Sequence, residues 1–231
     1  MASDGYELDW LRAEHQGGGR SHILHTLADL KQRHGIRGQR VLELGSGLGR
    51  NLLVLAEHNQ VQGVEALDGA VRLAREAGVP TEQADLEQGT LPWPAAAWDW
   101  ILMLDVLEHL VAPERLLAEA RRLLSPQGRI VVNVPNCFDW RCRWRLMRGE
   151  GIDSARHFPG QPVWRYPHLR FFRHADLLAL LRDAGFELVE DLSGTQPSLP
   201  KARRWPALAG RIAKGWPDLA ASGFFVVAQR A

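Results

Sequence analysis

The chain has 231 residues, of which 45% are hydrophobic and 24% are charged, and its formal net charge is +1. This length suits one domain of generous size over residues 1–231, with enough apolar residues to bury a core. The balanced charge gives no indication of a nucleic-acid partner. No run approaches the roughly 20 apolar residues of a membrane span, so we expect no transmembrane segment.

The two cysteines, Cys137 and Cys142, are five residues apart, and no further cysteine completes a zinc set or a disulfide framework. We therefore expect no metal site and a reducing, cytoplasmic setting. The N-terminal residues do not resemble a signal peptide, which agrees with that expectation.

Two helical stretches, residues 6–16 and 21–34, precede the first strand and are separated by three glycines. Leucine and isoleucine at helical spacing give the second stretch one apolar face. We expect residues 1–38 to form a helical cover over one edge of the sheet. The alternative is that Tyr6, Trp10 and His22 belong to a lid over a bound ligand.

The stretch VLELGSGLGRN, residues 41–51, predicts a buried strand, a tight glycine turn and a helix that begins at Asn51. Glycine tolerates positive φ and lets a ligand approach the backbone closely, so we expect a small molecule over the turn. Arg50 occupies the position of the third glycine in the dinucleotide fingerprint, which argues against NAD. Glu43, just before the turn, would repel a pyrophosphate and attract a cationic ligand.

The pattern E-x-G-x-G-x-G resembles the first motif of class I S-adenosylmethionine (SAM) methyltransferases, whose cofactor carries an ammonium and a sulfonium. The resemblance implies a Rossmann-like α/β fold with a seven-stranded, mostly parallel sheet, helices on both faces and an antiparallel edge strand. It also implies SAM as the cofactor. The residues of the motif that would contact it are Glu43, Gly45, Ser46, Gly47 and Gly49. An ordinary glycine-rich turn stays open as the alternative.

Three further acids follow at regular intervals. Glu65 ends the predicted strand 61–65 and is placed to accept hydrogen bonds from ribose hydroxyls. Asp85 and Leu86 follow a weak strand over residues 79–84, and the resemblance implies that this pair meets the adenine. Glu43, Glu65, Asp85 and Asp105 are 22, 20 and 20 residues apart, about one strand-turn-helix unit each. Strand ends at this spacing predict a ligand crevice at the carboxyl edge of the sheet. Asp68 predicts an N-cap for a helix over residues 69–77.

Residues 98–104 form the most apolar predicted strand, and a run without alternation indicates burial on both faces of a parallel sheet. The following turn, DVLEHL at residues 105–110, resembles that of small-molecule methyltransferases and lacks the N/D-P-P-Y/F signature of enzymes that methylate adenine or glutamine amides. His109 lies at the mouth of the predicted crevice. It is either a general base, because its ordinary pKa suits proton abstraction at neutral pH, or a capping or core histidine.

After a helix over residues 113–124 and a strand over 129–134, residues 136–170 are too long for a plain connection. They contain an amphipathic helix with Trp140, Trp144 and Met147 on one face and arginines on another. We expect a substrate cover that holds a small, anionic or hydroxyl-bearing acceptor through Trp140, Trp164, Tyr166 and Arg170. The alternatives are a tryptophan face packed on the core with solvated arginines, or contact with a membrane surface or an acidic partner.

The chain closes with a predicted helix over residues 175–184 and two strands, 186–191 and 223–229, that would pair antiparallel. Residues 135–143 through His168 also resemble the MetW-type methionine-biosynthesis proteins. Methyl transfer from a sulfonium needs a base only for a hydroxyl acceptor, and His109 and His168 are the catalytic candidates. We expect O-methylation of a small molecule, with a SAM-binding partner of a biosynthetic acyltransferase as the alternative.

Overall fold

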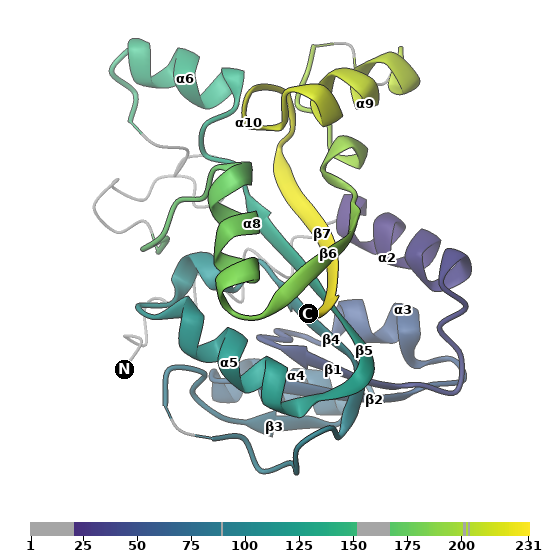
Figure 1. Cartoon of the computed structure of the whole chain (residues 1–231). Coiled ribbons are helices and arrows are strands. Elements are labelled where there is room, and N and C mark those ends of the chain that lie inside the picture. The colour runs from purple at the N-terminus through teal and green to yellow at the C-terminus, as the bar shows by residue number, and fades with distance from the viewer. Residues whose placement is uncertain (1–20, 89, 152–166, 201, 203) are drawn as a thin grey trace.

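The computed structural model describes residues 21–88, 90–151, 167–200, 202 and 204–231. The predictions made for Tyr6, Trp10, Trp164 and Tyr166 lie outside these residues. Seven strands form one sheet in the order β3-β2-β1-β4-β5-β7-β6 (Figure 1). The strands are β1 (Arg40–Leu44), β2 (Gln60–Glu65), β3 (Thr81–Gln83), β4 (Trp98–Leu104), β5 (Leu124–Pro135), β6 (Phe186–Asp191) and β7 (Gly223–Arg230).

The first five strands pair in parallel, and β7 runs antiparallel between β5 and β6. This arrangement confirms the predicted Rossmann-like fold with its antiparallel pair at one edge. Strands β1 and β4 are buried because they lie inside the sheet and have helices on both sides, which explains their largely apolar, non-alternating sequences. Their carboxyl ends point to the same edge, where a ligand crevice was expected from the sequence.

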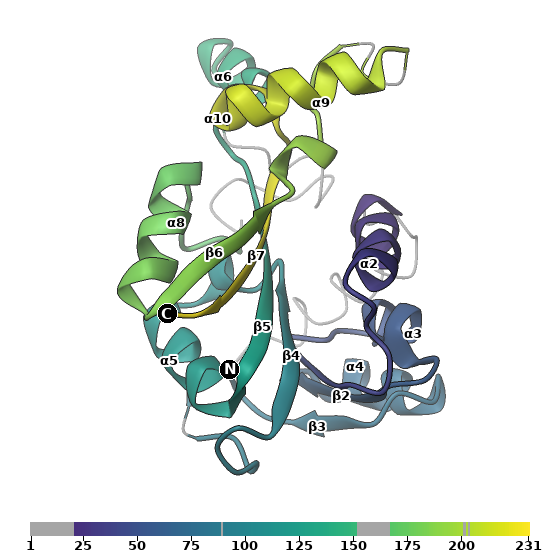
Figure 2. The same ribbon diagram turned by 45° about the vertical axis from the view of Figure 1, so that its right-hand side comes forward.

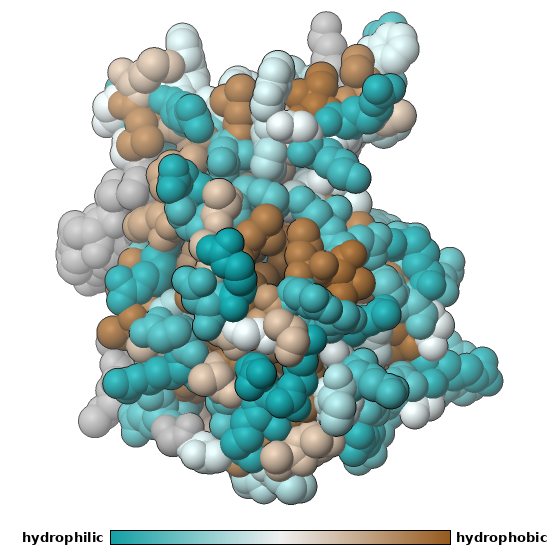
Figure 3. Space-filling model, viewed as in Figure 1, coloured by the Kyte–Doolittle hydropathy of each residue, from teal (hydrophilic) through white to brown (hydrophobic). Residues whose placement is uncertain are grey.

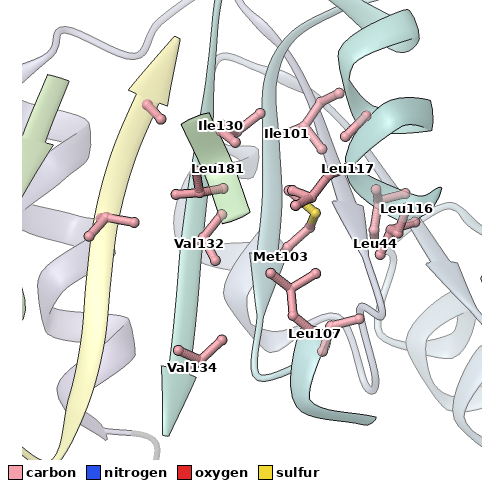
Figure 4. Packing of buried hydrophobic residues seen from close by; sticks show 14 of the residues in the cluster. Leu44, Ile101, Met103, Leu107, Leu116, Leu117, Ile130, Val132, Val134 and Leu181 are labelled. Atoms are coloured by element: carbon pink, nitrogen blue, oxygen red, sulfur yellow. The ribbon is translucent and has the colours of Figure 1, made fainter. Parts of the chain in front are cut away.

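Helices cover both faces of the sheet, as Figure 2 shows with the sheet seen nearly edge-on. On one face α2 (Ser21–Arg33) and α3 (Arg50–Ala56) bury Leu27, Leu30 and Leu52 in one hydrophobic cluster. On the other face α5 (Pro113–Leu123) and α8 (His174–Asp183) bury leucines against β4 and β5, and Figure 4 shows Leu117 and Leu181 in this packing. Helix α4 (Asp68–Glu76) packs beside β2 and β3.

Three helices lie beyond the carboxyl end of β5, namely α6 (Trp140–Met147), α9 (Pro206–Gly215) and α10 (Pro217–Ala220) (Figures 1 and 2). The Asn136 side chain joins the segment before α6 to α10, because its Nδ2 donates to the carbonyls of Pro217 and Ala221. Apolar side chains reach the surface at this end of the molecule (Figure 3), among them Met147 and Leu208.

The structure contradicts one local prediction, the N-cap at Asp68, and one alternative, a tryptophan face of residues 140–147 packed on the core. Asp68 is the first residue of α4, and Leu67 occupies the cap position without a side-chain cap bond. In α6 the residues Trp144 and Met147 are 55% and 73% exposed, so that face of the helix does not pack on the core. The helix begins at Trp140 because Asp139 caps it, with Oδ1 accepting from the Cys142 amide at 2.9 Å.

Candidate functional site

The glycine turn after β1 uses left-handed backbone at Gly45, Gly47 and Gly49, whose φ values are +75°, +54° and +73°. The amides of Gly45 and Ser46 both donate to the Val64 carbonyl at 2.9 Å, which ties the turn to β2. A Cβ placed on Gly45 would lie 2.5 Å from Cγ2 of Val106. Glycine is therefore required here both for its backbone conformation and for the close approach of the segment after β4.

Glu65 at the tip of β2 is the carboxylate that faces the turn. Its Oε2 accepts from the Gly47 amide at 2.9 Å, and its Oε1 accepts from the amides of Ala66 and Leu67 at 2.8 and 3.0 Å. These bonds fix the carboxylate between β2 and the glycine turn and leave one lone pair of Oε2 for a further donor. This placement suits the ribose hydroxyl expected of Glu65.

Glu43 is fully buried at the end of β1, and its Oε1 accepts from Nδ2 of Asn51 at 2.7 Å. Asn51 lies in the first turn of α3 and is itself buried. From the sequence, Asn51 was interpreted only as the start of a helix, so its hydrogen bond to Glu43 was missed. The carboxylate is held beneath the turn, where its charge favours a cationic ligand.

Ser46 is also buried, because Gly63 on β2 leaves room for its side chain. A Cβ on Gly63 would lie 2.4 Å from Ser46 Oγ. Within the described part of the chain, Ser46 Oγ has no hydrogen-bond partner. A polar ligand bound over the glycine turn would supply a hydrogen-bond partner for this buried hydroxyl. The turn, Ser46 and Glu65 together fit a nucleoside cofactor with a cationic end.

Asp85 and Leu86 follow β3 next to Glu65, since the Ala84 amide donates to the Glu65 carbonyl at 3.1 Å. Asp85 is exposed, and its carboxylate accepts from the amide of Glu87 and from Nε2 of Gln88, both at 2.9 Å. Leu86 is partly buried against the core. The pair therefore presents one polar and one apolar side chain beside Glu65.

Asp105 follows β4 directly and has a φ of +57°, a conformation that aspartate adopts more readily than most residues. The Asn133 carbonyl accepts from its amide at 2.9 Å, and Nδ2 of Asn133 donates to its Oδ1. Gln196 continues the network, with Nε2 donating to Oδ1 of Asn133 at 3.1 Å. Asn133 and Gln196 were missed because no local pattern marks them, and both are buried.

The structure brings His109 and His168 together, although they are 59 residues apart in the sequence. Their rings lie 4.8 Å apart at 83°. Both belong to a cluster with Glu108, which is 1% exposed, and the Nε2 of each histidine is 3.9 Å from Glu108 Oε1. Glu108 and His109 lie on η1 (Leu107–His109), which follows β4, and His168 comes from the segment before α8. Glu108 was missed, although it lies inside the quoted turn motif.

Backbone contacts hold the segment that carries His168 against η1. The amides of Leu169 and Arg170 donate to the Glu108 carbonyl at 2.7 and 3.0 Å. Nδ1 of His109 lies 3.3 Å from the carbonyl oxygen of Pro167. The end of the predicted insertion is therefore attached at the carboxyl edge of the sheet.

The remaining described substrate candidates have local partners. The guanidinium of Arg170 donates to the Val111 carbonyl, and Nε1 of Trp140 donates to the Ser198 carbonyl at 3.0 Å. Trp140 thus joins α6 to the loop before α9, and Arg170 joins the insertion to the segment after η1.

Two arginines of α6 and Arg148 at its C-cap are paired with nearby carboxylates, whereas Nε of Arg143 donates to the Phe138 carbonyl. Arg141 lies 2.6 Å from Asp139, and Arg145 and Arg148 lie 3.3 and 2.7 Å from Glu150. These ion pairs neutralise part of the positive charge that suggested an anionic acceptor.

Comparison with known proteins gives one family match. The model of a family described as "Methyltransferase domain" matches residues 17–191. This range includes β1 to β6 and every described residue of the candidate site except those after Asp191.

Among curated proteins, the chain is 30% identical over 179 residues to the S-adenosyl-L-methionine-dependent Diels-Alderase iccD of Talaromyces variabilis, which covers 72% of this chain and 59% of the relative. It is 29% identical over 160 residues to the ubiquinone biosynthesis O-methyltransferase of Idiomarina loihiensis, covering 66% of this chain and 63% of the relative. The chain thus spans about three fifths of the length of these relatives.

Among solved structures, a SAM-dependent methyltransferase from Thermotoga maritima is similar with a TM-score of 0.63 and 20% identity, over 98% of this chain and 99% of that chain. One from Aquifex aeolicus has a TM-score of 0.60 and 16% identity, over 95% and 97%. At these identities the similarity shows the fold. Of the helices that the structure describes, none combines the length and hydrophobicity needed to cross a bilayer.

Proposed function

Because this chain belongs to the SAM-dependent methyltransferase family and its cofactor is S-adenosylmethionine, we propose that it methylates a hydroxyl oxygen of a small molecule. The observation that carries the proposal is the pair of imidazoles at the carboxyl edge of the sheet, where the ring of His168 lies against that of His109 on η1, the short helix that follows β4. A hydroxyl acceptor is the class that needs a proton acceptor at this place. The printed name of the Idiomarina relative, an O-methyltransferase, agrees with this choice.

In the proposed reaction the acceptor oxygen attacks the methyl carbon in line with the sulfonium. The carbon–oxygen bond forms while the carbon–sulfur bond breaks, and the sulfur keeps the electron pair as the neutral thioether of S-adenosylhomocysteine. The hydroxyl proton passes to Nε2 of His109 or His168. The rest of the site positions the two reactants and excludes water.

The cofactor would extend along the carboxyl edge of the sheet. Glu65 would bind the ribose hydroxyls, and Asp85 and Leu86 would meet the adenine. The turn residues Gly45, Ser46, Gly47 and Gly49, together with Glu43 and Asp105, would surround the methionine part. The bonds of Glu65 to the glycine turn and the unpartnered Ser46 hydroxyl support this assignment.

Residues 136–170 would form the substrate cover, with Trp140, Trp164, Tyr166 and Arg170 around the acceptor. The attachment of Leu169 and Arg170 to the Glu108 carbonyl supports a cover that ends beside the two histidines. The local partners of Arg170 and of the α6 arginines favour an uncharged hydroxyl acceptor over a strongly anionic one.

The test is incubation of the purified protein with methyl-labelled SAM and a panel of phenols, catechols, amines and carboxylates, followed by identification of the labelled product. We expect label on hydroxyl oxygens. Label on amines alone would contradict O-methylation, and SAM binding without any labelled product would contradict methyl transfer. Calorimetric titration with SAM and with NAD checks the cofactor independently.

The acyltransferase-partner role expected from the MetW-type resemblance stays a prediction. A pull-down that recovers a stoichiometric acyltransferase, together with an absence of methyl transfer into any cell fraction, would favour that role over the enzyme.

A further inference from the structure

We propose that Glu108, His109 and His168 bind one divalent first-row transition metal ion, such as Zn²⁺, Mn²⁺ or Co²⁺. No metal site was expected from the sequence, because the two cysteines do not complete a zinc set and Glu108 was not among the candidate site residues. The proposal rests on the proposed function only where it gives the ion a role toward the acceptor hydroxyl. Metal binding itself is tested without reference to activity.

The geometry of the three donors carries the proposal. One ligand atom from each residue lies within 4.8 Å of the other two. Both Nε2 atoms are 3.9 Å from the same carboxylate oxygen of Glu108. Metal bonds of about 2.0–2.2 Å at tetrahedral angles hold ligand atoms about 3.4 Å apart, so each 3.9 Å separation would shrink by about half an ångström. His109 can make that movement, since its side chain is 32% exposed.

The surroundings already orient the ligands. The contact of His109 Nδ1 with the Pro167 carbonyl favours the tautomer with a proton on Nδ1, which leaves the Nε2 lone pair for a metal. A backbone carbonyl in this position is a typical second partner of a metal-bound histidine. The hydrogen bonds from the Leu169 and Arg170 amides to the Glu108 carbonyl keep His168 opposite Glu108. Glu108 is almost completely buried, and a cation is an effective way to stabilise a carboxylate there.

The donor set determines the kind of metal. Imidazole nitrogen favours zinc and its first-row neighbours, whereas magnesium and calcium prefer oxygen ligands throughout. Two histidines and one carboxylate also leave a coordination position open, as in catalytic zinc sites. We therefore expect Mg²⁺ to compete poorly with Zn²⁺ or Co²⁺.

The site lies beside the cofactor turn. Val106, two residues before Glu108, packs closely on Gly45. A Cβ added to Gly45 would lie 2.5 Å from Cγ2 of Val106. An ion at the cluster would thus be placed to bind the acceptor oxygen at its open position. Coordination lowers the pKa of the hydroxyl, and the proton is released to solvent. When the ion is bound, the two histidines are its ligands. The ion then activates the acceptor hydroxyl, and no histidine acts as the proton acceptor.

The experiment uses the full chain after treatment with a chelator and dialysis. Titration with Co²⁺, followed by visible absorption, and calorimetric titration with Zn²⁺ measure stoichiometry and affinity. We expect one ion per chain, with affinity reduced about tenfold or more in Glu108→Gln and in His168→Gln. His25→Gln is the matched control, because His25 is an exposed histidine on α2. It should bind the metal as the unsubstituted protein does.

Circular dichroism and SAM titration of each variant show that it is folded. Metal affinity that is unchanged in folded Glu108→Gln and His168→Gln would overturn the site. Absence of saturable Co²⁺ or Zn²⁺ binding in a chain that binds SAM and transfers methyl groups would overturn the metal site and leave the proposed function standing. Metal binding at the triad in a chain that transfers no methyl group would support the site and contradict the proposed function.

Discussion

Nε2 of His174 lies 2.9 Å from Oδ2 of Asp191, and this ion pair joins the first turn of α8 to the end of β6. The ring also lies edge-on to Phe224 of β7, with centroids 5.4 Å apart. The hydrogen bond with Asp191 raises the pKa of His174 above 6.5. Burial acts to raise the pKa of Asp191, but hydrogen bonds from His174 and Ser193 outweigh it and lower the pKa to about 2.

These shifts predict how the free energy of unfolding depends on pH. The contribution of Asp191 is complete above its ordinary pKa of 3.8 and is lost as the pH falls toward about 2. The contribution of His174 is complete below 6.5 and is lost as the pH rises through its higher folded-state value. The pair therefore stabilises the fold most between about pH 4 and 6.5. Urea denaturation across pH measures this, and the decrease above pH 6.5 should be smaller in His174→Gln. An identical pH profile for that variant would contradict the assignment.

Gly45→Ala should destabilise the protein more than Gly38→Ala. Both glycines have left-handed backbone, with φ of +75° and +70°, so each alanine adds about 1–2 kcal/mol of strain. A Cβ at Gly38 meets no atom within 4 Å, whereas at Gly45 it meets Val106. Overpacking there adds about 1–3 kcal/mol. Thermal denaturation measures the difference, and equal losses of stability would show that the contact with Val106 is unimportant.

Glu65→Gln should weaken SAM binding by about 1–3 kcal/mol, because the proposed ribose bonds and the bond to the Gly47 amide lose a charged acceptor. Glu82→Gln is the matched control on the neighbouring strand β3, where Glu82 is exposed. Calorimetric titration with SAM should leave the control unchanged. A Glu65→Gln variant with the affinity of the unsubstituted chain would remove Glu65 from the proposed cofactor site.

His109→Gln and His168→Gln should each lower kcat about 100-fold or more while leaving the SAM dissociation constant nearly unchanged. Both roles proposed for these histidines, proton acceptor and metal ligand, need a free imidazole Nε2, whereas the proposed cofactor contacts come from other residues. Steady-state kinetics with a hydroxyl acceptor, together with SAM titration, separate the two effects. Parallel losses of turnover and SAM affinity would indicate a structural role for the histidines.

The element pattern could be predicted from local sequence. The strand over residues 41–44 and the glycine turn were recognisable because an apolar run followed by closely spaced glycines leaves few backbone alternatives. Glu43 was identified by the glycine motif, and the intervals to Glu65, Asp85 and Asp105 supported the set, because each βα unit uses about 20 residues. All four lie at or just after the carboxyl end of a strand.

Local sequence was a poorer guide where a residue's environment depends on a distant segment. The periodicity of α6 is genuine, yet Trp144 and Met147 are exposed, because amphipathic spacing shows which residues share a face and not what that face meets. The hydrogen bonds of Asn133 to Asp105 and Gln196 likewise join three separate segments. No spacing rule relates these residues.

The amino-acid sequence alone was enough to determine the α/β class, because backbone preferences and periodicity act within single βα units. The cofactor family followed from the resemblance of the glycine motif to the first motif of SAM methyltransferases. The union of Glu108, His109 and His168 was decided only in three dimensions. It depends on the chain after residue 166 returning to η1, where Leu169 and Arg170 bond to the Glu108 carbonyl. Contacts between segments so far apart in the sequence form only when the sheet and its connections are assembled.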